Sequence, residues 1–275
     1  MIVDAHCHAW TRWPYQPAVP DPGRGNAAAL LWHMDRNGVE RAVVICAAIG
    51  GNPDNAGDVT AAAARSDGRL VPFVDVDCRW HDTHHQPGAP ARLRAAIARF
   101  RPRGITHYMH EDGDPSWLLS PDGVEFLRIA EAEGLVLSLA CGPGQLAAVQ
   151  EAAARAPGLP ILLHHLARVR AGDDPALAAL VSAARTPNLH LKLSDVGFGV
   201  DDPWNFPHAR MRPVVEAALT AFGPARTVWG SDCPVTTEVV TYRQTLELVR
   251  THCPFIPEAA MPLVLGGTMA RLLAR

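Results

Sequence analysis

Two histidines one residue apart, His6 and His8, follow a short apolar segment at the start of the chain. In a β-strand successive side chains alternate between two faces, so these imidazoles and the carboxylate of Asp4 are expected to point the same way. Two imidazoles at the end of a strand can ligate a metal ion or transfer protons. A His-x-His pair in a loop is often merely solvated, so its function depends on what the fold places beside it.

A carboxylate near the other end of the chain adds to this chemistry. Asp232 follows an apolar segment that starts at Val228 and precedes Cys233 and Pro234. A carboxylate in that position can ligate a metal ion, or take a proton from water and pass it to a leaving group. The alternative is that Asp232 caps the helix that follows, a role that Asp often has.

Lysine usage singles out another residue. Of the 25 Lys and Arg residues, only Lys192 is a lysine. Where a coding bias replaces Lys by Arg, a remaining Lys either marks a position that needs a compact, tunable charge or has survived by chance on the surface. Lys192 and Ser194 alternate with Leu191 and Leu193, so they are expected to share the face opposite the leucines. A buried ammonium there needs a carboxylate partner, for which Asp232 is a candidate, or a substrate anion.

The elements that position these residues alternate regularly. Short apolar segments bounded by Gly, Pro or Asp predict strands, and the Ala-, Leu- and Arg-rich stretches between them predict helices. We expect strands at 2–6, 41–47, 70–76, 104–109, 135–140, 160–165, 189–194 and 226–231. We expect helices at 27–37, 56–65, 90–100, 121–133, 145–156, 174–185, 211–222, 237–250 and 257–273. Eight such units in about 250 residues predict a (β/α)8 TIM barrel that forms one domain over residues 1–275. A doubly wound open sheet is the alternative, but its glycine-rich phosphate motif is absent.

In a TIM barrel the chemistry lies at the C-terminal ends of the strands. Polar residues gather at those ends here, namely His6, His8, Asp75, Asp77, His107, His110, His164, His165, Lys192, Ser194, Asp195 and Asp232. Because side chains alternate along a strand, only one of His164 and His165 is expected to face the interior. The sequence does not say which one.

The loop after the third strand carries His81, His84 and His85 beside Arg79. We interpret these histidines as a solvated loop at the substrate mouth, with metal binding as the alternative.

Composition excludes several classes of protein. The chain of 275 residues is 48% hydrophobic and 19% charged with a net charge of −3, which argues against nucleic acid as a partner. It has neither an apolar run long enough for a membrane span nor the pattern of a secretory signal. The expected partner is a small-molecule substrate, and the sequence leaves the oligomeric state open, a homo-oligomer included.

The cysteines indicate a reducing compartment. All six stand apart, with no Cys-x-x-Cys pair, and five fall near strand ends, namely Cys7, Cys46, Cys78, Cys141 and Cys233. We interpret them as reduced, buried packing residues of a cytoplasmic protein.

Several motifs together resemble one protein family. They are Val3-Asp4-Ala5-His6-Cys7-His8, His165-Leu166, Lys192-Leu193-Ser194, Phe222-Gly223-Pro224-Ala225-Arg226 and Trp229-Gly230-Ser231-Asp232-Cys233-Pro234, with weaker matches at Gly104-Ile105-Thr106-His107, Trp117-Leu118-Leu119 and residues 266–272. This set resembles the amidohydrolase superfamily, in the branch of amidohydrolase-related TIM-barrel hydrolases that includes sugar lactonases and 2-pyrone-4,6-dicarboxylate lactonase. The resemblance covers essentially the whole chain.

The resemblance implies roles for the matching residues. His6, His8 and Asp232 would ligate one divalent metal ion, with zinc as the first candidate, and Asp232 would also be the base toward water. His165 would be a further ligand or a stabiliser of the transition state. Lys192 and Ser194 would contact the substrate.

Further substrate contacts are expected from the fourth strand and the loops. His107 is the candidate from the strand. Arg79, Arg210 and Arg212 are loop arginines that could hold a substrate carboxylate.

Departures from the family pattern bear on the metal. Members that bind metal commonly carry a histidine at the end of the fifth strand, where this chain has Ala140. The fourth strand lacks the lysine that would carry a bridging carbamate. The sequence therefore predicts a mononuclear site or a metal-free one. Thr106 stands where sugar-lactonase-like members often have Arg, which weakens the assignment of a specific lactone.

The first functional hypothesis is hydrolysis of a carboxylated lactone. Asp232 would take a proton from the attacking water and return it to the leaving oxygen, while His6, His8 and His165 stabilise the oxyanion directly or through one metal ion. One alternative is metal-dependent, non-oxidative decarboxylation of an aromatic or unsaturated acid, or hydrolysis of a C–C or C–N bond. The other is a ligand-binding barrel without catalysis, which the missing histidine at Ala140 motivates.

Overall fold

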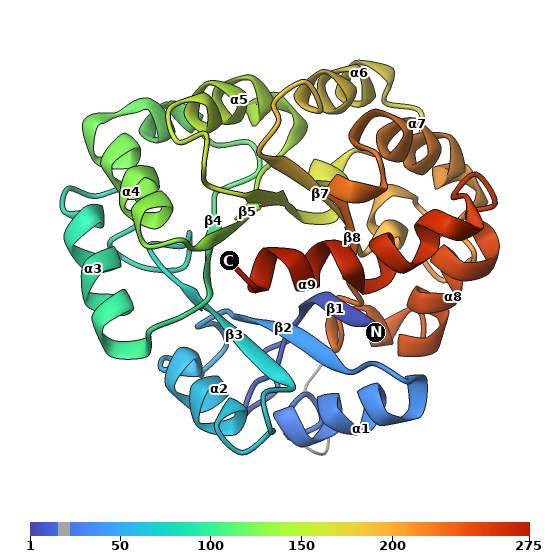
Figure 1. The fold of residues 1–275 in the computed structure, drawn as a ribbon, viewed down its shortest axis with the longest axis horizontal. Coiled ribbons are helices and arrows are strands. Elements are labelled where there is room, and N and C mark those ends of the chain that lie inside the picture. The colour runs from blue at the N-terminus through green and yellow to red at the C-terminus, as the bar shows by residue number, and fades with distance from the viewer. Residues whose placement is uncertain (16–22) are drawn as a thin grey trace.

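The computed structural model describes residues 1–15 and 23–275. Eight parallel strands follow one another in chain order in a single sheet, and a ring of helices surrounds them (Figure 1). The strands are β1 (Val3–Cys7), β2 (Arg41–Cys46), β3 (Leu70–Asp75), β4 (Gly104–Tyr108), β5 (Val136–Ala140), β6 (Ile161–Leu163), β7 (Leu189–Leu193) and β8 (Thr227–Trp229). The helices are α1 (Ala27–Asn37), α2 (Asn55–Ala63), α3 (Ala89–Phe100), α4 (Pro121–Ala132), α5 (Leu146–Ala154), α6 (Asp174–Ala183), α7 (Arg212–Phe222), α8 (Tyr242–His252) and α9 (Thr268–Leu273). The predicted single-domain TIM barrel is confirmed.

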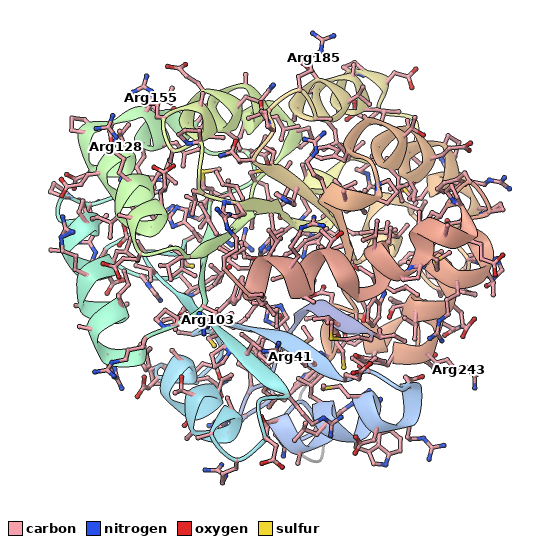
Figure 2. All side chains as sticks on the ribbon, viewed as in Figure 1. Arg41, Arg103, Arg128, Arg155, Arg185 and Arg243 are labelled. Carbon is pink, nitrogen blue, oxygen red and sulfur yellow. The ribbon has the colours of Figure 1, made fainter. Side chains whose placement is uncertain are left out.

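The strands are buried on both faces, as their apolar sequences require. Val43 and Ile45 of β2 pack inside the barrel, whereas Val44 and Cys46 pack outward against the helices. Arginines such as Arg128, Arg155 and Arg185 are exposed on the outer surface (Figure 2).

The last helix closes the N-terminal end of the barrel. In Figure 1 α9 crosses the barrel axis, and Met269, Leu272 and Leu273 pack with interior residues such as Phe73 and Val228. The polar strand ends therefore face the opposite, open end.

Close approach of β1 to the segment after β8 brings the two edges of the sheet together. The amide of Asp232 donates to the carbonyl of His6 over 2.7 Å, and the amide of His8 donates to the carbonyl of Cys233 over 2.7 Å. Gly230 allows this contact, because a Cβ there would lie 2.7 Å from the Cβ of His6. The closure thus places Asp232 directly beside the two histidines of β1.

The helices form where the sequence predicted them, with two differences. The helix expected at 237–250 begins at Tyr242, because Thr241 caps it by accepting the amide of Gln244 at 3.2 Å. The helix expected at 257–273 is broken, and only its last part is α9. Gly266 interrupts it where the chain passes β1, since a Cβ there would lie 2.7 Å from the amide of Val3.

Two further predictions concern the cysteines and membrane-spanning helices. The six cysteines are free and buried, as expected of packing residues. Among the described residues, every helix is too short or too polar to span a bilayer.

Candidate active site and metal centre

A bulge in β1 decides which side chains of the first motif meet. Between Asp4, which pairs with Ala42, and Cys7, which pairs with Val44, the strand holds one residue more than its neighbour. The expectation that Asp4 shares the face of His6 and His8 is therefore wrong, because alternation fails at a bulge.

Asp4 instead fastens β1 to the end of β8 and to α8. Its carboxylate accepts the amide of Ser231 at 2.9 Å, the hydroxyl of Ser231 at 2.6 Å and the hydroxyl of Tyr242 at 2.8 Å. These bonds hold Asp232, the next residue, against β1.

Asp232 and the two histidines of β1 form the centre of the candidate site. Oδ1 of Asp232 lies 3.2 Å from Nε2 of His6 and 3.3 Å from Nε2 of His8, and all three residues are buried. Burial alone would raise the pKa of Asp232, but the imidazoles of His165, His6 and His8 outweigh it and hold that pKa well below its usual range. Asp232 is therefore an ionised carboxylate at neutral pH.

The same three residues fit a metal ion. Nδ1 of His8 donates to the carbonyl of Ile45 at 3.0 Å, which leaves Nε2, the ring nitrogen that faces Asp232, as the atom that could ligate a metal ion. Nε2 of His6 and Oδ1 of Asp232 are buried without a well-directed hydrogen bond to any described residue. Their spacing of 3.2 Å is close to the distance of about 3.3 Å between ligands in a tetrahedral zinc site.

Both histidines after β6 lie beside His6. The ring centroids of His164 and His165 are 4.5 Å and 4.6 Å from that of His6. The expectation that only one of the pair faces the interior is wrong, because β6 ends at Leu163 and His165 takes a left-handed backbone with φ of 45°. Burial lowers the pKa of His165 to about 3, so its imidazole is neutral.

Lys192 lies behind this centre, with its side chain fully buried. Its Nζ lies 3.0 Å from Nδ1 of His6 and 2.5 Å from the hydroxyl of Ser138. The expected ion pair with Asp232 is not formed. Leu191 and Leu193 pack outward, on the face opposite Lys192, as the alternation predicted. Burial lowers the pKa of Lys192 to about 7, so both of its protonation states are within reach at neutral pH.

The contact with Lys192 sets the tautomer of His6. An ammonium donates to Nδ1, which puts the imidazole proton on Nε2, facing Asp232. A neutral amine can instead accept from Nδ1–H, and Nε2 then offers its lone pair to a metal ion. Lys192 therefore acts on the centre through His6.

A cavity of about 510 Å³ opens over Asp232, His8 and His165 at the C-terminal ends of the strands. Its aromatic lining consists of Tyr15, Trp80, Tyr108 and Phe198. Arg79 and Arg168 bring positive charge to it. This volume falls within the usual range of small-molecule sites.

Comparison with known proteins agrees with this geometry. The sequence model of the family described as Amidohydrolase matches residues 3–275. The chain belongs to the amidohydrolase family. It is a hydrolase of the amidohydrolase superfamily, as the resemblance of its motifs implies.

Relatives of this amidohydrolase include lactonases. The L-fucono-1,5-lactonase of Burkholderia ambifaria is 29% identical over 248 residues, which cover 85% of this chain and 80% of that protein. An amidohydrolase from Burkholderia multivorans with bound zinc has a similar structure, with a TM-score of 0.79 and 23% identity over 100% of this chain and 99% of that one. A probable 2-pyrone-4,6-dicarboxylic acid hydrolase from Acinetobacter baumannii, solved with citric acid bound, has a TM-score of 0.75 and 17% identity over 100% of this chain and 99% of that one. At these identities the two structures establish the shared fold.

Asp195 is a candidate site residue of the amidohydrolase that the sequence placed at a strand end without assigning it a role. It lines the cavity, and its carboxyl group, His165 and Asp232 place their ligand atoms within 4.8 Å of one another. If side chains continued to alternate after Lys192, Asp195 would lie on the outer face of the barrel. The left-handed backbone of Asp195, with φ of 45°, turns the chain after β7 and ends this alternation. Burial, reinforced by the charge of Asp232, raises the pKa of Asp195. Its position at a strand end was the signal in the sequence.

Arg168 and Tyr108 also line the cavity and were not predicted. Arg168 is shared between Glu111, at 3.3 Å, and Asp195, at 3.8 Å. Arg168 lies in the turn after β6, where several consecutive residues have left-handed backbone angles. Such a turn has no periodic sequence pattern from which the direction of its side chains could be predicted.

Several predicted site residues do not reach the cavity of the amidohydrolase. His107 lies on the outer face of β4, with its ring centroid 5.0 Å from that of Trp117. Arg210 is exposed near Asp201 and Arg212 begins α7, so Arg79 alone of the proposed loop arginines lines the cavity.

Ser194 and Lys192 contact histidines of the centre and do not line this cavity. The hydroxyl of Ser194 lies 3.0 Å from Nδ1 of His165, and Lys192 contacts His6 as described. Both side chains are therefore placed to orient imidazoles.

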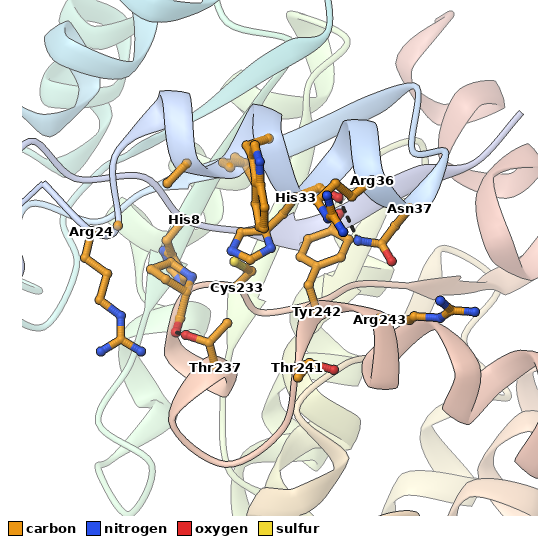
Figure 3. Close-up of a pocket in the computed structure, with 15 residues that line it drawn as sticks. His8, Arg24, His33, Arg36, Asn37, Cys233, Thr237, Thr241, Tyr242 and Arg243 are labelled. Carbon is orange, nitrogen blue, oxygen red and sulfur yellow. Dashed lines mark hydrogen bonds between the residues drawn. The ribbon is translucent and has the colours of Figure 1, made fainter.

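A second cavity of about 470 Å³ adjoins His8 between α1 and α8 (Figure 3). His33 stacks on Tyr242 in it, with ring centroids 5.6 Å apart, and Arg36 and Arg243 lie toward its rim. Asp232 does not line it, so the chemistry of Asp232 belongs to the cavity over the strand ends.

Proposed function

We propose that this amidohydrolase hydrolyses a lactone of a carboxylated small molecule with water that Asp232 activates. The observation that carries the proposal is the buried carboxylate of Asp232, 3.2 Å and 3.3 Å from the Nε2 atoms of His6 and His8, at the floor of a cavity that also contains arginine. The relationship to an L-fucono-1,5-lactonase supports the substrate class.

In this mechanism Asp232 accepts a proton from water as the water oxygen attacks the lactone carbonyl carbon. The ring C–O bond then breaks, and Asp232 returns the proton to the leaving oxygen, which gives a hydroxy acid. His165 can stabilise the oxyanion, because it lines the cavity and its Nε2 carries the proton when the hydroxyl of Ser194 donates to Nδ1.

One divalent ion, zinc first, suits the donor set of this site. His6, His8 and Asp232, whose ligand atoms lie within 4.8 Å of one another, would hold it through imidazole nitrogen and carboxylate oxygen. Bound there, such an ion supplies Lewis-acid polarisation of the carbonyl and a lowered pKa of water. The zinc in a structural relative supports this choice. Elemental analysis of the purified chain distinguishes it from a metal-free site.

Arg79 is the residue we assign to the substrate carboxylate. It lines the cavity and forms no ion pair with a described residue, whereas Arg168 already contacts Glu111 and Asp195. A guanidinium without a carboxylate partner binds a substrate anion by charge-assisted hydrogen bonds.

The test is proton release on a panel of lactones with and without a carboxylate, including sugar 1,5-lactones and pyrone carboxylates. We expect turnover of at least one carboxylated lactone, and a loss of about 1000-fold or more in Asp232→Asn, since that variant lacks the base. Asp112→Asn, at an exposed carboxylate in the loop after β4, is the matched control. Absence of turnover on every lactone, or an Asp232→Asn variant as active as the wild type, contradicts the proposal. Release of carbon dioxide from aromatic acids would support the decarboxylase alternative.

A further inference from the structure

A second group of histidines lies on the outer side of the barrel wall. His84 and His85 come from the loop after β3, and His107 comes from the outer face of β4. The three residues offer ligand atoms that all lie within 4.8 Å of one another. Nε2 of His85 is 3.2 Å from Nε2 of His107, close to the distance of about 3.3 Å between two nitrogens on one tetrahedral zinc ion.

Backbone carbonyls fix the tautomers of two of these histidines. Nδ1 of His84 donates to the carbonyl of Asp77 at 2.7 Å, and Nδ1 of His107 donates to the carbonyl of Val76 at 3.0 Å. A carbonyl can only accept, so both neutral imidazoles keep their lone pairs on Nε2. Hydrogen bonds of this kind are the usual support of metal-bound histidine.

The facing nitrogens of His85 and His107 are unusually close. Nδ1 of His107 already donates to the carbonyl of Val76, so its Nε2 can only accept when the ring is neutral. The two facing Nε2 atoms of His85 and His107 need either a single shared proton or a cation between them.

The loop holds its histidines in place before any ion binds. The ring of His85 is stacked between those of His84, at 3.6 Å, and Trp117, at 4.4 Å. Asp77 accepts the amide of His85 at 3.2 Å and Nε of Arg92 at 2.8 Å. A site held in this way loses little conformational freedom on binding.

A cavity of about 470 Å³ gives access to the group. His84 and His85 line it together with His110, Asp114, Ser116 and Gln145. A water molecule entering from this side can complete the coordination. His110 also lines the cavity over Asp232, so the two cavities share one wall residue and no metal-ligand candidate.

We propose that His84, His85 and His107 form a metal-binding site, separate from the Asp232 centre, for a divalent ion that prefers imidazole, such as Zn²⁺. Three neutral imidazoles and an open position suit zinc, cobalt, nickel or copper better than calcium or magnesium, which prefer oxygen ligands. The bound ion would tie the loop after β3 to β4.

The test is titration of the chelator-treated full chain with Zn²⁺, in a His8→Ala/Asp232→Asn background that removes the first centre. We expect one Zn²⁺ per chain in this background. Adding His85→Ala should weaken Zn²⁺ binding by at least about 10- to 100-fold. Removal of a residue that only hydrogen-bonds to a metal ligand already has an effect of that size, and His85 is a proposed ligand itself. His81→Ala, in the same loop but in contact with Asp75 at 3.2 Å, is the matched control and should bind as before.

Absence of Zn²⁺ binding in the background variant, or binding that His85→Ala leaves unchanged, overturns the proposal. If His85→Ala unfolds, as judged by its circular dichroism, anomalous scattering at the zinc edge from wild-type crystals soaked in Zn²⁺ replaces it. A peak bounded by the Nε2 atoms of the three histidines supports the site, and no peak there rejects it. Neither outcome depends on lactone hydrolysis.

Discussion

Nζ of Lys192 lies 3.0 Å from Nδ1 of His6, and this contact joins the only lysine of the chain to the centre of the candidate site. Because Nε2 of the same ring faces Asp232 at 3.2 Å, we expect the protonation state of Lys192 to influence what His6 presents to that carboxylate. We therefore expect the lysine to be a positioning residue whose effect passes through the imidazole of His6.

Replacing Lys192 tests this role. Lys192→Met should lower kcat by about 10- to 100-fold, the effect typical of losing a partner that orients a ligand, and should leave KM within about twofold. Lys192→Arg should lose as much, because the larger guanidinium does not fit between Ser138 and His6. Steady-state kinetics on the lactone that is turned over provides the measurement. A rise in KM with kcat unchanged would assign Lys192 to substrate binding instead.

We expect Arg79, which lines the cavity, to determine the preference of the enzyme for a carboxylated substrate. Arg79→Gln should raise KM for a carboxylated lactone by about 10- to 100-fold, which corresponds to the loss of about 1.5–3 kcal/mol for a charged hydrogen bond. The same variant should leave hydrolysis of an uncharged lactone within about twofold. Arg210→Gln is the control, because Arg210 is exposed away from the cavity. Equal losses on charged and uncharged substrates would show that Arg79 has another role.

Gly230 permits the contact between β1 and the segment after β8. Gly230→Ala would place a Cβ 2.7 Å from that of His6, so the two segments must separate. We expect a loss of about 1–3 kcal/mol in the free energy of unfolding, together with a large drop in kcat. Gly144→Ala, where an added Cβ meets no atom within 4 Å, is the matched control. Chemical denaturation of both variants measures the difference, and equal stability would contradict the steric account.

Neutral buried histidines should make the protein sensitive to acid. Burial lowers the pKa of His190 from 6.5 to about 4, so between these values the unfolded chain binds a proton that the folded chain does not. The contribution of His190 to stability is complete above pH 6.5 and is lost as the pH falls toward 4, at about 1.4 kcal/mol per pH unit.

Urea unfolding between pH 7.5 and 5 measures this slope. His190→Gln should flatten it by about 1 kcal/mol per pH unit, because one group no longer titrates differently in the two states. His252→Gln, at an exposed histidine that ends α8, is the control. A His190→Gln variant with the wild-type slope would mean that His190 is already protonated in the folded state.

The sequence by itself determined the barrel and the centre of the candidate site. Apolar segments of strand length alternate with helical stretches, and this order admits few folds. His6, His8 and Asp232 stand at the ends of the first and last strands, which a closed barrel must place side by side. Alternation along β7 also predicted correctly that Lys192 lies on the face opposite Leu191 and Leu193.

Only the tertiary structure decided which other side chains join that centre. Alternation holds inside a regular strand and fails at the bulge after Asp4 and at the left-handed turns of His165 and Asp195. Those backbone angles depend on packing between distant segments, so no local pattern reveals them. For the same reason His107, at the end of the short strand β4, faces the outer histidine group and leaves the cavity to Tyr108. Strand periodicity fixes that neighbouring side chains point to opposite faces, and packing against the rest of the barrel decides which face is inside.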